Sequence, residues 1–126
     1  MAAIYELDVS MALDDLAWHF VNHHDLDLCE ETSNGLRELE ATEAAEIFDA
    51  AFAIVRRHWE ELGAVAQNKD FGFVHAWLDE IGIQKQIDPL DDRIWKLLDP
   101  WRDYGLMQYW ITYARKYPER CVANSE

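Results

Sequence analysis

Basic side chains are scarce in this sequence. Its 126 residues contain 11 lysines and arginines against 25 aspartates and glutamates, which gives a net charge of −14 at pH 7. Affinity for DNA or RNA comes largely from cations that neutralise phosphates, and anionic lipid also repels an acidic surface. The composition therefore argues against direct binding to nucleic acid or to a membrane, and it favours a basic protein as the partner.

Cysteines and long apolar runs are also scarce. Cys29 and Cys121 are the only two cysteines, and neither belongs to a Cys-x-x-Cys motif, so we expect inert thiols in a reducing compartment. The longest purely apolar run, Ala50–Val55, is far shorter than the roughly 20 residues that span a membrane. The N-terminus lacks the basic and apolar segments of a signal peptide. These absences predict a soluble, cytoplasmic protein.

The motifs of common enzymes are missing as well. The five glycines are scattered, so no glycine-rich loop can hold a phosphate, and no Gly-x-Ser-x-Gly motif presents a nucleophilic serine. The 25 acidic residues offer many carboxylate pairs, but no feature of the sequence singles one pair out. We therefore predict that the protein is not an enzyme and that it needs no cofactor.

Helical periodicity runs along nearly the whole chain. Apolar residues recur every three or four positions, and no alternating strand pattern of useful length occurs. Without a linker or repeat, this pattern predicts one all-α domain over residues 1–126, a compact bundle of about six to seven helices. Its core is expected over about residues 10–118, followed by a polar tail over 119–126.

Capping residues and turn signals set the expected ends of these helices. They are a helix capped by Ser10, a helix from near Asp27 with a turn signal at Ser33–Gly35, the helix Thr42–Leu62 ended by Gly63, a helix from Phe71 to Gly82, and two helices begun by Asp88–Pro89 and Asp99–Pro100, the second halted by Pro118.

Aromatic side chains are concentrated between Arg93 and Trp110, in "RIWKLLDPWRDYGLMQYW". Because large rings contribute most when they are buried, we assign them mainly to the core and to contacts between helices. Trp101 is the exception, since it falls in the first turn of its expected helix and is a candidate for an aromatic contact with a partner. The residues predicted to be largely buried are Phe48, Phe52, Ile54, Trp59, Leu78, Ile94, Trp95 and Trp110.

Negative charge is concentrated in the first two-fifths of the chain. Residues 1–49 contain 13 acidic residues and one base, Arg37, whereas residues 50–126 contain 12 acidic and 10 basic residues. Residues three apart on a helix have Cβ atoms about 5–6 Å from each other, so successive carboxylates can imitate the phosphates of a duplex. The predicted partner-binding residues are Asp25, Asp27, Glu30, Glu31, Glu38, Glu40, Glu43, Glu46 and Asp49.

Several functions are compatible with such an acidic surface. It can act as a DNA mimic that occupies the basic surface of a transcription factor or other DNA-binding protein. It can equally belong to an immunity protein or antitoxin that inhibits a basic toxin, since both use negative charge to capture a basic surface. Solvated helix faces that only aid solubility are the third interpretation. A homo-oligomer is compatible with all three.

A metal-dependent enzyme is a further alternative, based on Asp15, His19, His23 and Asp27. These residues are spaced by four, so they would share one helix face if a helix continued to Asp27. Two histidines at this spacing can bind Zn²⁺, but no glutamate follows His19 to complete a His-Glu-x-x-His motif. We favour a polar, solvated helix face and predict no metal site.

Three stretches of the chain form a recognisable set: "LDDRIWKLL" (Leu90–Leu98), Phe20-Val21-Asn22, and a Tyr-x-Arg-x-x-Pro-Glu pattern at Tyr113–Glu119. In these stretches the chain resembles a bacterial family named for DNA-mimic protein nineteen. At Leu13–Trp18 the chain reads "LDDLAW", whereas the family usually has Asn-Gly-Gly-Phe and a glutamine there. The resemblance covers roughly residues 13–120. It implies an all-helical fold, and it also suggests DNA mimicry, a function known for few members.

Overall fold

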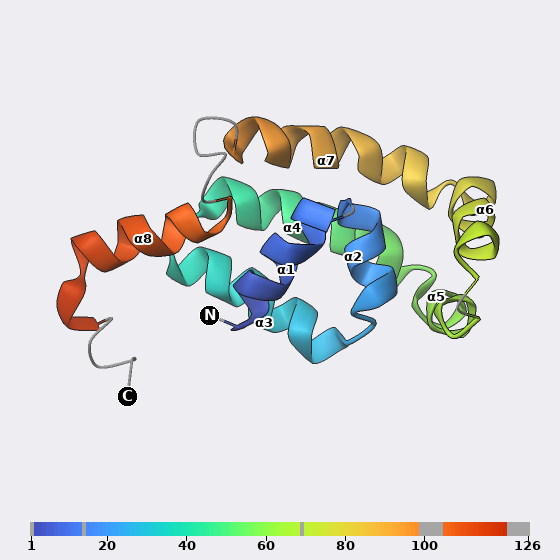
Figure 1. Ribbon diagram of the computed structural model, residues 1–126, viewed down its shortest axis with the longest axis horizontal. Coiled ribbons are helices and arrows are strands. Elements are labelled where there is room, and N and C mark those ends of the chain that lie inside the picture. Colours follow the sequence, from blue (N-terminus) through green and yellow to red (C-terminus); the bar gives the residue numbers. More distant parts are fainter. Residues whose placement is uncertain (1, 14, 69, 99–104, 121–126) are drawn as a thin grey trace.

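The computed structural model describes residues 2–13, 15–68, 70–98 and 105–120. Within these ranges the chain is helical and contains no strand, which confirms the all-α prediction. The helices are α1 (Ala2–Leu13), α2 (Leu16–Asn22), α3 (Leu26–Glu38), α4 (Thr42–Arg56), α5 (Trp59–Ala66), α6 (Phe71–Ile81), α7 (Ile83–Leu98) and α8 (Met107–Lys116) (Figure 1).

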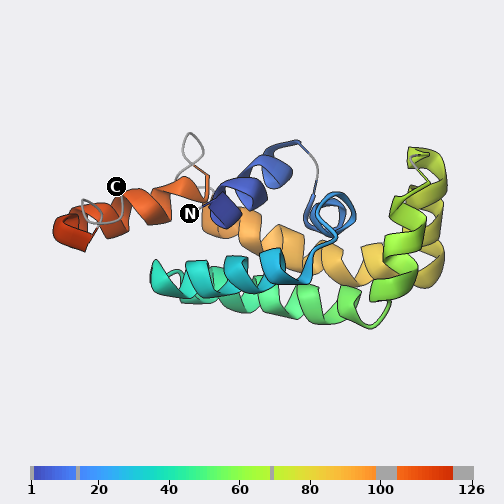
Figure 2. The same cartoon turned by 90° about the horizontal axis from the view of Figure 1, so that it is seen from below.

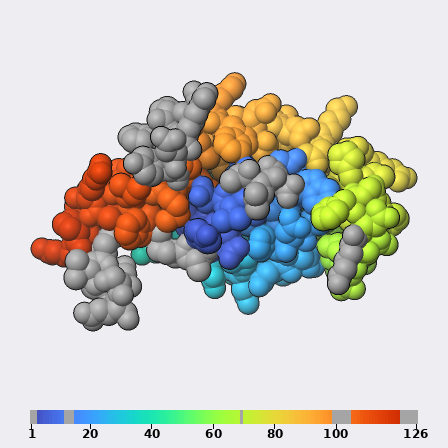
Figure 3. Space-filling view, in the orientation of Figure 1, coloured from blue at the N-terminus to red at the C-terminus, as the bar shows by residue number. Residues whose placement is uncertain are grey.

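Helix α4 occupies the middle of the domain and packs against α3 and α7. Helices α1 and α2 cross this group, with α1 on α3 and α2 on both α4 and α7 (Figure 2). Helices α5 and α6 form one end of the elongated molecule, and α8 forms the other (Figure 3). The shared core is built from large side chains of most helices, including Ile4, Phe20, Leu36, Phe48, Leu62, Leu78, Ile87 and Ile94.

The first predicted helix is two helices in the structure. Ser10 does not cap a helix; it lies inside α1, is buried, and the core already begins at Ala3, ahead of residue 10. Asp15 instead caps α2, because its carboxylate accepts a hydrogen bond from the Trp18 backbone N–H at 3.0 Å. An extended aspartate that satisfies a free helical N–H is a favoured helix start, so the local sequence already held this signal.

The long predicted helix Thr42–Leu62 is also divided. Helix α4 ends at Arg56, the chain turns at Arg57 and His58, and α5 then continues through Gly63. Gly63 does not stop a helix. A Cβ at this position would come within 2.6 Å of the His24 ring, so the glycine allows close packing between α5 and the α2–α3 connection. Gly63 is therefore needed for a contact with a distant residue, and a sequence pattern cannot distinguish such a glycine from one that ends a helix.

The later boundaries mix confirmed and wrong predictions. Gly82 ends α6 in the left-handed conformation (φ 83°), and α8 ends before Pro118, both as predicted. Asp88–Pro89 does not begin a helix, because α7 starts at Ile83 and Pro89 lies inside it. Helix α3 runs unbroken through Ser33–Gly35. The start predicted at Asp99–Pro100 lies outside the described residues.

Burial follows the predictions with one clear exception. Phe48, Leu78 and Ile94 are fully buried, while Phe52, Ile54, Trp59 and Trp110 are half-buried against the core. Trp95 was expected in the core but is 42% exposed. Ile87, Ile94 and Leu98 face inward on α7, and the next residue after Ile94 points about 100° away from it around the helix. Trp101 lies outside the described residues.

Candidate protein-binding surface

The predicted carboxylates lie on two packed helices and on the turn that joins them. Eight of the nine side chains are exposed and Asp49 is half-buried. We call the set the acidic patch: Asp25 at the N-cap of α3, Asp27, Glu30, Glu31 and Glu38 within α3, Glu40 in the turn, and Glu43, Glu46 and Asp49 within α4. Because α3 packs on α4, both helices belong to one unit of the fold.

Two members of the acidic patch are neutralised by bases. Arg37 forms an ion pair with Asp49 at 2.7 Å, and Lys116 forms one with Glu40 at 2.9 Å. The Tyr117 hydroxyl also donates to Glu40, and the hydrogen bonds from Lys116 and Tyr117 hold the pKa of this carboxyl below its usual range. Within the described ranges, the remaining seven carboxylates form no ion pair with a base, so they supply the net negative charge of the acidic patch.

The turn between α3 and α4 is tightly fixed. Glu40 adopts a left-handed backbone conformation (φ 64°), which is uncommon for a residue other than glycine. The Ala41 N–H donates to the Leu36 carbonyl at 2.8 Å across this turn, and Leu39 and Ala41 are buried on either side. The strained turn is thereby held by the core, and its carboxylate is directed to the end of α8.

Aromatic packing fixes α4 beneath its carboxylates. The Phe48 and Phe20 rings lie 5.4 Å apart, the Phe52 ring stacks on Phe20 at 6.0 Å, and the Arg56 guanidinium lies over Phe52 at 5.6 Å. Contacts of this kind add to the burial of the rings themselves. Glu43 and Glu46, on the opposite side of the same helix, are therefore carried by a rigid element.

The four candidate metal ligands Asp15, His19, His23 and Asp27 do not share one helix face, because no single helix continues to Asp27. Helix α2 ends at Asn22, with His23 as its C-cap, and Asp27 lies on α3. His19 is fully buried and hydrogen-bonded through Nδ1 to Ser10 Oγ at 2.8 Å, while Asp15 accepts from Trp18 and Gln84. Among the residues described by the structure, no group of three or more His, Cys, Asp or Glu could hold a metal ion.

The buried environment of His19 also opposes metal binding and acid–base catalysis by this side chain. Burial, reinforced by the charge of nearby His23, lowers the pKa of His19 from its ordinary 6.5 to about 3. The ring packs edge-on against Phe20 and Phe48. His19 is thus a neutral histidine of the core that joins α2 to Ser10 of α1.

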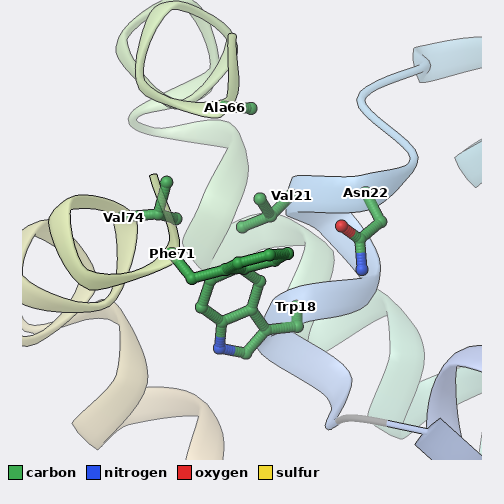
Figure 4. A pocket seen from close by; sticks show the side chains of 6 residues that line it. All are labelled: Trp18, Val21, Asn22, Ala66, Phe71 and Val74. Atoms are coloured by element: carbon green, nitrogen blue, oxygen red, sulfur yellow. The ribbon is translucent and has the colours of Figure 1, made fainter. Parts of the chain in front are cut away.

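A feature that the sequence interpretation missed is an apolar pocket between α2, α5 and α6 (Figure 4). Phe71 is spaced with the buried Val74 and Leu78 at helical intervals, yet it is 73% exposed and its ring lies over Trp18, with centroids 5.7 Å apart. The pocket has a volume of about 400 Å³. We call it the α2–α6 pocket; its lining residues are Trp18, Val21, Asn22, Ala66, Phe71 and Val74.

The described helices include none with the length and apolar character needed to cross a bilayer. The fold and the acidic patch thus define a class, the small acidic all-helical proteins. A family model for DMP19-like proteins matches residues 2–117, and the chain belongs to the DMP19-like protein family. Searches of curated proteins and of solved structures return no significant match to this chain.

Proposed function

We propose that the protein binds a basic, DNA-binding protein through the acidic patch and occupies the surface that this partner uses for DNA. The observation that carries the proposal is the group of seven exposed carboxylates without a basic partner in the described structure, carried by the rigid α3–α4 pair. Membership of the DMP19-like family supports it. On this proposal the protein acts by binding alone, without catalysis or a cofactor.

The proposed binding is electrostatic, so it should depend on salt. Screening shortens the Debye length from about 10 Å at 0.1 M salt to about 3 Å at 1 M, and charged surfaces act mainly on the rate of association. A single exposed charge contributes little. The acidic patch should therefore be tested by reversing several of its carboxylates together.

The variant Glu30→Lys/Glu43→Lys/Glu46→Lys reverses three exposed carboxylates and leaves the Arg37–Asp49 ion pair intact. Its matched control reverses the same number of charges elsewhere, through Glu80→Lys, Asp92→Lys and Glu119→Lys, all exposed and outside the acidic patch. The partner is first isolated by affinity capture and identified.

Stopped-flow association with that partner at 0.1 M salt should then slow on the order of tenfold or more for the patch variant. The control variant should slow much less, because the local field and not the total charge steers the encounter. Equal slowing by both variants, or no slowing by either, would show that the acidic patch only aids solubility. Capture of a nuclease-like toxin would favour the immunity interpretation.

A further inference from the structure

The α2–α6 pocket has the form of a site that receives a side chain. Val21 from α2, Ala66 from α5 and Val74 from α6 converge on it, and the Phe71 ring stands over Trp18 at its edge (Figure 4). Phe71 sits at the first position of α6 beside Trp18, and its side chain is 73% exposed to water. An exposed aromatic ring beside an apolar hollow is the kind of surface at which binding energy concentrates.

The chemistry of the pocket favours an apolar occupant. None of its six lining residues is charged, and Asn22 is the only one with a hydrogen-bonding side chain apart from the Trp18 indole. A polar small molecule would find few groups to orient it, since such sites normally combine apolar walls with several placed polar groups. An aliphatic or aromatic side chain needs only the walls.

The surroundings of the pocket favour a basic occupant segment. Asp70 precedes Phe71 and caps α6, Glu61 on α5 accepts a hydrogen bond from the Trp77 indole of α6 at 3.1 Å, and Asp25 follows Asn22 by three residues. All three carboxylates are exposed. These carboxylates lie on or next to the elements that form the pocket, so a second copy of this chain, with its net charge of −14, would be repelled. Lys and Arg beside an apolar side chain would be attracted.

We propose that the α2–α6 pocket receives an aliphatic or aromatic side chain projecting from a basic segment of the protein partner. This inference rests on the proposed function, because the inserted side chain would belong to the same basic partner that the acidic patch binds. Asp25 and Asp27 of the acidic patch lie just beyond the end of α2, so one partner surface can meet the carboxylates and insert its anchor.

Two synthetic peptides provide the test with the full-length protein. Both are short chains of lysine and arginine; one carries a central phenylalanine and the other an alanine at the same position. Titrations are followed by ¹³C-methyl NMR of Val21 and Val74, which line the pocket. The phenylalanine peptide should shift both methyl signals and bind on the order of tenfold more tightly than the alanine peptide.

Two exposed phenylalanines of α6 give a matched pair of variants. Phe71→Ala should remove the preference for the phenylalanine peptide, whereas Phe73→Ala, which alters a 50% exposed ring outside the pocket lining, should retain it. Equal binding of the two peptides by the wild-type protein, or unshifted Val21 and Val74 signals, would overturn the inference. Two further results would overturn the inference. One is concentration-dependent self-association of the wild type that Phe71→Ala abolishes, and the other is binding of free indole as tightly as the phenylalanine peptide.

The acidic-patch variant separates this inference from the proposed function. If reversal of Glu30, Glu43 and Glu46 weakens both peptides equally and no preference for phenylalanine exists, the acidic patch is supported and the pocket is not. If the preference persists but the reversal changes neither affinity nor its salt dependence, the pocket is supported and the acidic patch is not.

Discussion

His19 should make the fold sensitive to mild acid. Its ring is buried between Phe20 and Phe48 and bonded to Ser10, and burial lowers its pKa from 6.5 to about 3. In the unfolded chain the same ring takes up a proton near its ordinary pKa of about 6.5. Between those two pKa values the unfolded state binds more protons than the folded state, so stability is complete above pH 6.5 and is lost as the pH falls toward 3.

The size of the effect follows from the difference in proton binding. Each pH unit below 6.5 costs about 1.4 kcal/mol as long as the folded ring stays neutral. At pH 5 the loss due to His19 is therefore about 2 kcal/mol relative to pH 8. Acidification also relieves repulsion in a chain of net charge −14, so the contribution of His19 must be measured as a difference between variants.

Urea unfolding at pH 8 and pH 5 provides this comparison. His19→Gln removes the titrating ring and keeps a polar group that can reach Ser10, although its stability at pH 8 will be lower. The wild type should lose about 2 kcal/mol more than this variant between the two pH values. His75→Gln, at an exposed position, should behave like the wild type. Identical pH dependence in wild type and His19→Gln would refute the assignment of a neutral, buried histidine.

Three other predictions concern the fold. Leu78→Ala should lower the free energy of unfolding by about 2–5 kcal/mol because Leu78 is fully buried. Trp95→Ala should cost less than about 1 kcal/mol because Trp95 is 42% exposed on α7, and a loss in urea unfolding as large as that of Leu78→Ala would contradict the exposed position of Trp95. Gly82→Ala should destabilise the fold by about 1 kcal/mol, and the cause is the left-handed φ alone because a Cβ at this position would have space. Gly82→Asn should cost less. Equal thermal stability of the wild type and both variants would argue against the left-handed cap. Burial, reinforced by the charge of Asp25, raises the pKa of Cys29 to about 12, so in a Cys121→Ser background Ellman's reagent at pH 8 should react with the thiol only after unfolding, and rapid reaction of the native protein would disprove its burial.

The ends of helices could be predicted from the sequence where local signals alone determine them. Gly82 marks the end of α6 correctly, because a left-handed stop depends only on the adjacent backbone. The Asp88–Pro89 signal failed because Ile83 and Ile87 are buried in the core and extend α7 upstream of it. The break after Arg56 had no local marker, since the continuing apolar pattern suits one helix as well as two.

The site was accessible from the sequence only in part. The spacing of Glu43 and Glu46 on a helix, with Phe48 facing inward, places both carboxylates on the exposed side of α4. The neutralisation of Glu40 by Lys116 joins residues 76 positions apart, and no sequence pattern links them. The α2–α6 pocket likewise depends on how three helices converge, and the helical spacing of Phe71 with Val74 and Leu78 does not indicate it.

Competition with DNA tests the central claim most directly. A labelled duplex is bound to the captured partner, and its fluorescence anisotropy is followed as this protein is added. We expect the wild-type protein to displace the duplex, the variant Glu30→Lys/Glu43→Lys/Glu46→Lys to displace it poorly, and the charge-matched control to displace it nearly as well as the wild type. A ternary complex in which the partner holds this protein and the duplex together would contradict the proposal that the acidic patch takes the place of DNA.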